Sequence, residues 1–276
     1  AAKNHYTTIN IILNKKQMIL FNQIVSQPIL NKKMTQDKMK VEVWTDIMCP
    51  YCYLGKIHYE KALRQFAHAD EIELEWKAFQ LNPDLPDKGK GYPVTDYLIN
   101  SVGYPEEGIK SMFESLKKLA DEAGVKFNLQ NAIAANTHDA HRLIKLASKR
   151  GLDSAVLMKL SKAYFEEAKD YSDWNLLISI GKEVGLEEDE ITTMLESDEY
   201  SYEIKQDIQE AGNLGFDTVP TFLMDRRQAI VGSEPVELFL KVLNKAYNAW
   251  KSRNTEAVKP EVIKGLSCSA DGTCEI

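Results

Sequence analysis

Cys49 and Cys52 are separated by two residues in the motif Cys49-Pro50-Tyr51-Cys52. The motif follows an alternating apolar segment, residues 40–46, and opens a segment with helical periodicity. A dithiol between a strand and a helix is typical of thiol redox chemistry, because the helix N-terminus stabilises a thiolate. We expect Cys49 to be exposed and to attack, and Cys52 to face inward and resolve. Tyr51 carries no positive charge, so helix dipole and backbone N–H groups must supply the acidity of Cys49.

Nearby polar residues leave other readings open. Asp46 lies three residues before Cys49 and would oppose its ionisation if the carboxylate were close. A zinc site would need two ligands besides the cysteines, and His138 and His141 are the candidates because they stand three residues apart. Structural packing or a capping hydrogen bond is the plainer role for both histidines. We predict no metal site.

The composition excludes several classes of function. The chain of 276 residues has a formal net charge of −7, which argues against a basic surface for nucleic acid. Four cysteines are too few for a disulfide framework in a chain this long, and no apolar run is long enough to span a membrane.

The first 39 residues make a poor signal peptide, so we expect a cytoplasmic protein. Its expected partners are proteins or small molecules that carry a disulfide or a thiol.

The order of elements predicts an α/β protein. Residues 40–80 have the pattern of a β-α-β unit, and residues 214–251 that of a β-β-α unit. Residues 81–213, which separate them, have mainly helical periodicity and are predicted to form a helical insertion. Residues 1–39 are predicted to be a poorly ordered extension, and residues 252–276 a polar tail with a second cysteine pair.

Three separated motifs resemble one known family. Residues 46–55, 136–143 and 219–225 occur in the order found in the FrnE-like branch of the DsbA family, and the resemblance covers roughly residues 40–250. It implies a thioredoxin fold (β-α-β … β-β-α) with a large helical insertion between the halves, and thiol–disulfide oxidoreductase activity. It also implies that Pro220 is cis and brings the backbone of Val219 against the cysteines.

The resemblance also suggests site residues. The expected catalytic pair is Cys49 and Cys52, and the residues expected to contact substrate are Pro50, Tyr51, Val219, Pro220 and His141. No cofactor is expected to stay bound, although glutathione is a candidate co-substrate. Related FrnE-like chains can carry a second cysteine pair near the C-terminus, so Cys268 and Cys274 are either a second redox pair or ordinary thiols.

Two rival functions remain. The branch is related to 2-hydroxychromene-2-carboxylate isomerases and kappa-class glutathione transferases, which suggests a glutathione-dependent isomerase or transferase. Those relatives typically carry serine where Cys49 stands, so the intact dithiol argues against this rival. The other rival is a chaperone-like protein that binds clients in an apolar cleft.

Overall fold

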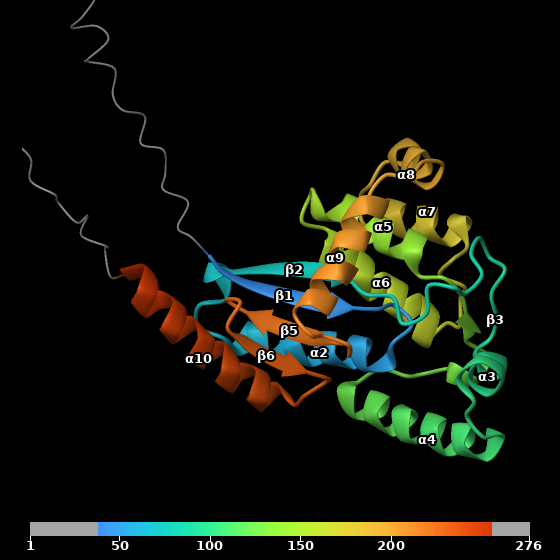
Figure 1. Ribbon diagram of the computed structural model, residues 1–276, viewed down its shortest axis with the longest axis horizontal. Coiled ribbons are helices and arrows are strands. Elements are labelled where there is room, and N and C mark those ends of the chain that lie inside the picture. Colours follow the sequence, from blue (N-terminus) through green and yellow to red (C-terminus); the bar gives the residue numbers. More distant parts are fainter. Residues whose placement is uncertain (1–37, 256–276) are drawn as a thin grey trace, which may run out of the picture. The chain divides into compact units, whose positions relative to one another are not determined.

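A four-stranded mixed sheet forms the centre of the protein (Figure 1). The computed structural model describes residues 38–255, so Cys268 and Cys274 lie outside the described residues. The strand order is β2-β1-β5-β6, in which β1 pairs in parallel with β2 and antiparallel with β5, and β6 pairs antiparallel with β5. The strands are β1 (Met39–Thr45), β2 (Ile72–Ala78), β5 (Thr221–Met224) and β6 (Gln228–Val231).

The two faces of the sheet are covered by different helices. Val43 and Phe222 are opposite each other in the β1–β5 register. Phe222 contacts the aromatic rings of Tyr59 in α2 (Pro50–Gln65) and Phe239 in α10 (Val236–Thr255), which places these helices on one face. Trp44 alternates to the other face and donates its indole N–H to the Asp207 carbonyl in α9 (Ser201–Asn213). Period-two alternation therefore assigns each helix its side.

The segment between β2 and β5 is mainly helical, as its periodicity predicts. One departure is a two-stranded antiparallel sheet, β3 (Tyr92–Pro93) with β4 (Ile133–Ala134), whose strands are too short for alternation to be recognised. The predicted insertion, residues 81–213, begins in the connection before β3 and ends at the last residue of α9. The remaining elements are η1 (Ala69–Glu71), α3 (Val94–Tyr97), the π-turn η2 (Leu98–Val102), α4 (Glu106–Ala123), η3 (Leu129–Asn131), α5 (His138–Ser148), α6 (Asp153–Phe165), α7 (Trp174–Glu183) and α8 (Glu188–Leu195).

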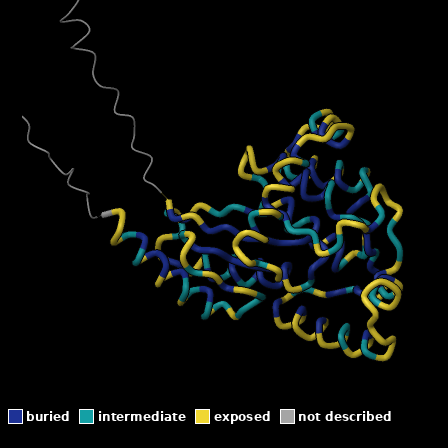
Figure 2. The backbone as a smooth tube through the Cα atoms, viewed as in Figure 1, coloured by how far each residue is buried: buried dark blue, intermediate teal, exposed yellow. Residues whose placement is uncertain are grey.

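One hydrophobic core runs through the sheet side and the insertion. Buried backbone continues from the strands into α5 and α6 in Figure 2. Leu143 in α5 and Leu160 in α6 are fully buried and belong to the same cluster as Val41, Val43 and Phe239. The insertion is therefore fixed against the rest of the fold by apolar burial. None of the described helices is both long and apolar enough to cross a membrane.

Candidate active site

The dithiol occupies the turn between β1 and α2. Cys49 is the N-cap of α2 with extended backbone angles (φ −86°, ψ 115°), and Pro50 takes the first helical position, where a missing N–H is tolerated. The Cys49 N–H donates to the Asp46 carbonyl at 3.2 Å, and the Cys52 N–H donates to the Cys49 carbonyl at 3.0 Å. These bonds place both cysteines at the start of α2, with Cys49 at the N-cap and Cys52 at the third helical residue.

Cys52 has the surroundings of a resolving thiol. Its side chain is buried, and its Sγ accepts the Asp46 N–H at 3.5 Å. Burial, and then contact with Cys49, raises the pKa of Cys52 well above that of an ordinary thiol. Cys52 is therefore held protonated and close to Cys49.

Cys49 is less accessible than the sequence predicts. We expected an exposed thiol, but the residue is only 5% exposed. Its Sγ donates to the Val219 carbonyl at 3.6 Å, and the Val219–Pro220 peptide bond is cis. A loop 170 residues away in sequence therefore covers the sulfur. The Cys49 side chain makes no capping hydrogen bond to α2, so the expected contact between its sulfur and the backbone N–H groups of the first turn is absent.

Gly55 allows the proline loop to approach α2. A Cβ added at Gly55 would lie 3.0 Å from Cγ of Pro220 and 3.5 Å from the ring of Phe222. Glycine in a helix interior costs about 1 kcal/mol relative to alanine, so its presence often has a packing reason. This glycine, one turn after the dithiol, was the signal available in the sequence for the close approach.

His141 lies inside the protein. The structure places this residue, predicted to contact substrate, only 2% exposed, with Nε2 3.0 Å from the Phe79 carbonyl and 3.4 Å from Oδ1 of Asp46. The other Asp46 oxygen, Oδ2, accepts the Leu81 N–H at 2.7 Å. His141 therefore reaches the dithiol through Asp46 rather than facing solvent. Sequence reasoning considered Asp46 only as an opposing charge and missed this connection.

The other polar residues around His141 join the parts of the insertion. Arg142 donates to Oδ1 of Asp139 at 2.8 Å, to the Glu199 carbonyl at 2.8 Å, and to the carbonyls of Met194 and Ser197. Burial alone would raise the pKa of Asp139, but hydrogen bonds from His138, Trp174 and Arg142 outweigh it and lower the pKa to about 2. This cluster fastens α5 to its neighbours.

The histidines do not complete a metal cluster with the cysteines. Among the described residues, no group of three or more His, Cys, Asp or Glu side chains is arranged to hold a metal ion. His138 lies beside Asp139, whereas His141 lies beside Asp46. The two histidines therefore serve different neighbours.

An apolar cavity lies beside the dithiol helix. Tyr51 is 46% exposed and lines a cavity of about 370 Å³ together with Leu54 and His58 on the same side of α2. Pro50, between Tyr51 and the N-cap, is partly buried. The rest of the lining comes from α4, from the segment that leads into α10 and from the first residues of α10: Leu119, Glu122, Ser233, Glu234, Pro235, Val236 and Glu237.

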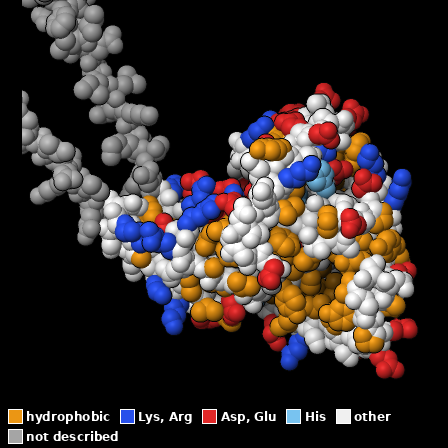
Figure 3. Space-filling model, viewed as in Figure 1, with side chains coloured by type: hydrophobic (Ala, Val, Ile, Leu, Met, Phe, Trp, Pro, Cys, Tyr) orange, Lys and Arg blue, Asp and Glu red, His pale blue; other side chains and the backbone are white. Residues whose placement is uncertain are grey.

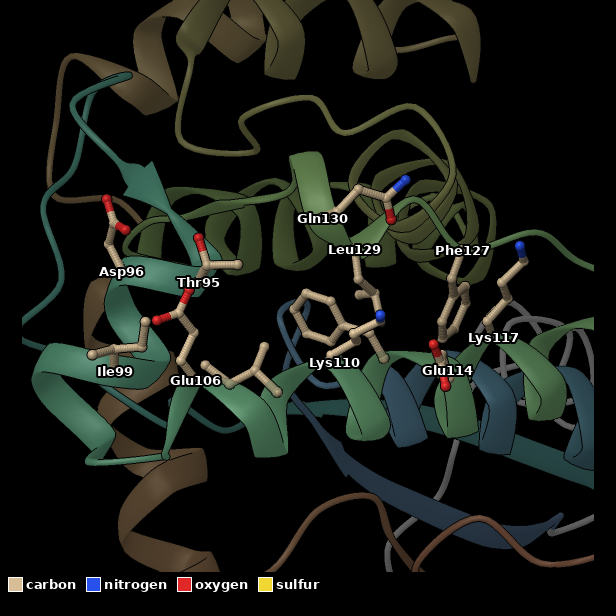
Figure 4. A pocket seen from close by; sticks show the side chains of 12 residues that line it. Thr95, Asp96, Ile99, Glu106, Lys110, Glu114, Lys117, Phe127, Leu129 and Gln130 are labelled. Carbon is tan, nitrogen blue, oxygen red and sulfur yellow. The ribbon is translucent and has the colours of Figure 1, made fainter.

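A larger cavity of about 550 Å³ lies within the insertion, and sequence reasoning did not predict it. Figure 4 shows its lining side chains extending from α3, α4 and the segment before β4. Figure 3 shows hydrophobic side chains around a hollow on the side of α3 and α4. Phe127 of its lining stacks on Tyr53, the residue after Cys52, with ring centroids 6.0 Å apart. The cavity therefore adjoins the dithiol helix but contains neither cysteine.

Known proteins are similar to this chain in sequence and in fold. A probable DsbA oxidoreductase from Streptomyces coelicolor is 31% identical, with a TM-score of 0.72 over 86% of this chain and 99% of its own. The uncharacterised Bacillus subtilis protein YwbO is 24% identical over 74% of this chain and 95% of its own length. The cytosolic disulfide reductase DsbM from Pseudomonas aeruginosa shares the fold, with 14% identity and a TM-score of 0.53 over 78% of this chain and 98% of its own.

The predicted fold and family are thereby confirmed. The strand order, the helical insertion and the dithiol at the start of α2 form a thioredoxin-like fold. The sequence pattern of the DSBA-like thioredoxin domain matches residues 40–244. The chain belongs to the DSBA-like thioredoxin domain family.

Proposed function

We propose that this protein is a thiol–disulfide oxidoreductase that reacts through Cys49 and Cys52. One observation carries the proposal: Sγ of Cys49 faces the Val219 carbonyl at 3.6 Å, while Cys52 lies buried behind it against the Asp46 N–H. Thiol–disulfide exchange needs one sulfur that attacks the substrate and a second sulfur close enough to resolve the mixed disulfide. Family membership supports the same chemistry.

The reaction proceeds in two displacements. The Cys49 thiolate attacks a substrate disulfide, forms a Cys49–substrate bond, and releases one substrate sulfur as a thiolate that takes a proton. Cys52 then loses its proton and attacks the Cys49 sulfur, which closes the Cys49–Cys52 disulfide and releases the second substrate thiolate. The protein loses two electrons and the substrate gains two. The reverse sequence oxidises a dithiol substrate.

The proline loop and the cavity beside Tyr51 are the proposed substrate site. A substrate backbone that takes the place of Cys49 at the Val219 carbonyl would align its disulfide with the sulfur, and Pro220 holds the loop at this position. Tyr51 lines the apolar cavity, which would accommodate an adjoining side chain of the substrate, and Pro50 lies between Tyr51 and Cys49 in the chain. In this scheme His141 does not contact the substrate and acts on the dithiol from the protein interior, through Asp46.

Glutathione is the proposed small-thiol partner, and the cytoplasm the proposed location. The Pseudomonas reductase with this fold is described as cytosolic, and its structure has also been determined with glutathione. A redox titration of Cys49 and Cys52 against glutathione tests the partner. Labelling all four thiols during the titration tests whether Cys268 and Cys274 are a second redox pair. If Cys268 and Cys274 are a second redox pair, they should become oxidised as the Cys49–Cys52 pair becomes oxidised.

Insulin reduction tests the proposed activity. The wild-type protein should reduce insulin with a thiol reductant present, and Cys49→Ser should abolish turnover, because serine cannot form the mixed disulfide. The Cys268→Ser, Cys274→Ser double variant is the matched control and should retain the reaction at the first pair. Isomerase turnover with glutathione that survives Cys49→Ser would contradict the proposal. Protection of clients from aggregation by a Cys49→Ala, Cys52→Ala variant, without any exchange by the wild type, would favour the chaperone-like alternative.

A further inference from the structure

Asp46 is connected to both cysteines through its backbone. Its N–H contacts Sγ of Cys52 at 3.5 Å, and its carbonyl accepts the Cys49 N–H at 3.2 Å. The side chain of Asp46 is completely buried. The carboxylate therefore belongs to the residue whose backbone contacts both cysteines, and it lies in surroundings where water and salt screen its charge only weakly.

The two oxygens of this carboxylate have unequal partners. Oδ2 accepts the Leu81 N–H, whereas Oδ1 is buried with no hydrogen-bond partner. The group nearest to Oδ1 is Nε2 of His141 at 3.4 Å, which directs its hydrogen bond at the Phe79 carbonyl. Both neighbours of Nε2 are acceptors, so Nε2 carries the hydrogen. His141 is therefore the side chain that offsets the charge on Oδ1.

The charge of Asp46 also acts on two tyrosines. Tyr164 in α6 and Tyr171 after it are buried, and burial first raises the pKa of each hydroxyl. The negative charge of Asp46 raises the pKa of both hydroxyls further, and Tyr164 also raises the pKa of Tyr171. The field of Asp46 thus extends into the insertion. Within the described residues, His141 is the basic group that reaches its carboxylate.

We propose that Asp46 and His141 are positioning residues that set the redox equilibrium of the dithiol in opposite directions. The inference rests on the proposed exchange at Cys49 and Cys52. The Asp46 charge disfavours a neighbouring thiolate and so favours the disulfide, whereas His141 offsets that charge and favours the reduced form. Because His141 belongs to α5, the insertion acts on the cysteines through this pair.

The test is the equilibrium constant of the Cys49–Cys52 pair with glutathione. Asp46→Asn should shift it about tenfold toward the reduced dithiol, equivalent to about 30 mV. His141→Leu should shift it the other way, and the double variant should resemble Asp46→Asn, because His141 acts through Asp46. His141→Gln, whose amide N–H can replace the ring N–H, should restore the wild-type value. Asp139→Asn is the matched control, a carboxyl on α5 away from the dithiol, and should leave the constant unchanged.

A second measurement needs no substitution. If the pair and the dithiol influence each other, the titration midpoint of the His141 ring must differ between reduced and oxidised wild-type protein. Ring resonances in NMR spectra report both midpoints, so the result stands even where a variant fails to fold. Equal midpoints, or shifts of Asp46→Asn and His141→Leu in the same direction, would overturn the inference. Failure of a Cys49–Cys52 disulfide to form at any glutathione ratio would instead overturn the proposed function.

Discussion

The dithiol turn at residues 49–52 and the polar segment at residues 136–142 both concentrate reactive side chains, yet they serve the fold differently. In the first, the Cys49 sulfur meets a loop 170 residues away in the sequence, and Tyr51 of the same helix is exposed and lines an apolar cavity. In the second, Asn136 donates to the Pro83 carbonyl, Asp139 accepts the indole N–H of Trp174, and Arg142 donates to the Met194 carbonyl, all inside the insertion. The difference teaches that residue types show which chemistry is possible, whereas burial and partners decide where it can occur.

The largest effect is expected at the dithiol turn. Cys52→Ser should leave the first displacement intact but stop the second, so a mixed disulfide on Cys49 accumulates and insulin turnover falls at least about a hundredfold. In the wild type, the second step should keep accelerating above the ordinary thiol pKa of about 8.5, because the pKa of Cys52 is raised. Mass spectrometry of the trapped species and stopped-flow rates against pH measure both. Turnover of Cys52→Ser at the wild-type rate would show that Cys52 has no resolving role.

The next largest effect is expected in the polar segment, as a loss of stability. Arg142→Leu removes one of the hydrogen-bond donors to Asp139 and a donor to several carbonyls, and should lower the free energy of unfolding by about 3 kcal/mol. Arg227→Leu, at the exposed hairpin, should change it by less than about 0.5 kcal/mol. Urea unfolding measures both. Unchanged stability of Arg142→Leu would remove the distinction between the two regions.

A smaller effect tests the contact between α2 and the proline loop. Gly55→Ala places a methyl group about 3.0 Å from Pro220 and should slow insulin reduction several-fold, because the loop must move. Gly212→Ala on α9 is the control, since its Cβ would meet no atom within 4 Å, and it should raise stability by about 0.5–1 kcal/mol without changing the rate. Equal rates for the two variants would mean that the close approach is not required for exchange.

The smallest effect is the pH dependence contributed by Asp139. Its pKa is about 2 in the folded protein and near 3.8 when unfolded, so the unfolded state binds the proton first as pH falls. The contribution of ionised Asp139 to the free energy of unfolding is complete above about pH 5 and is lost toward pH 2. Because the carboxyl is partly exposed, we expect this contribution to be about 1–2 kcal/mol. Urea midpoints of the wild type and Asp139→Asn between pH 6 and pH 2 should converge at the acid end. A constant difference would show that ionisation of Asp139 contributes nothing.

Much of the fold was predictable because its signals are local. The helix beginning at Pro50, the hairpin at residues 221–231 and the helices of the insertion follow from periodicity, proline placement and turn residues. The β3–β4 pair was missed because strands of two residues leave no alternation to detect. The strand order brings the loop at Val219 to the dithiol, and that contact is a property of the assembled sheet.

The sequence alone determined that two thiols three positions apart lie at a helix start, because spacing and a proline at the first helical position are local properties. Only the tertiary structure decided that Cys49 is covered, that His141 points inward to Asp46, and that Asn136, Asp139 and Arg142 join segments of the insertion. Burial depends on which distant segments pack around a residue, and no local pattern of residue types contains that information.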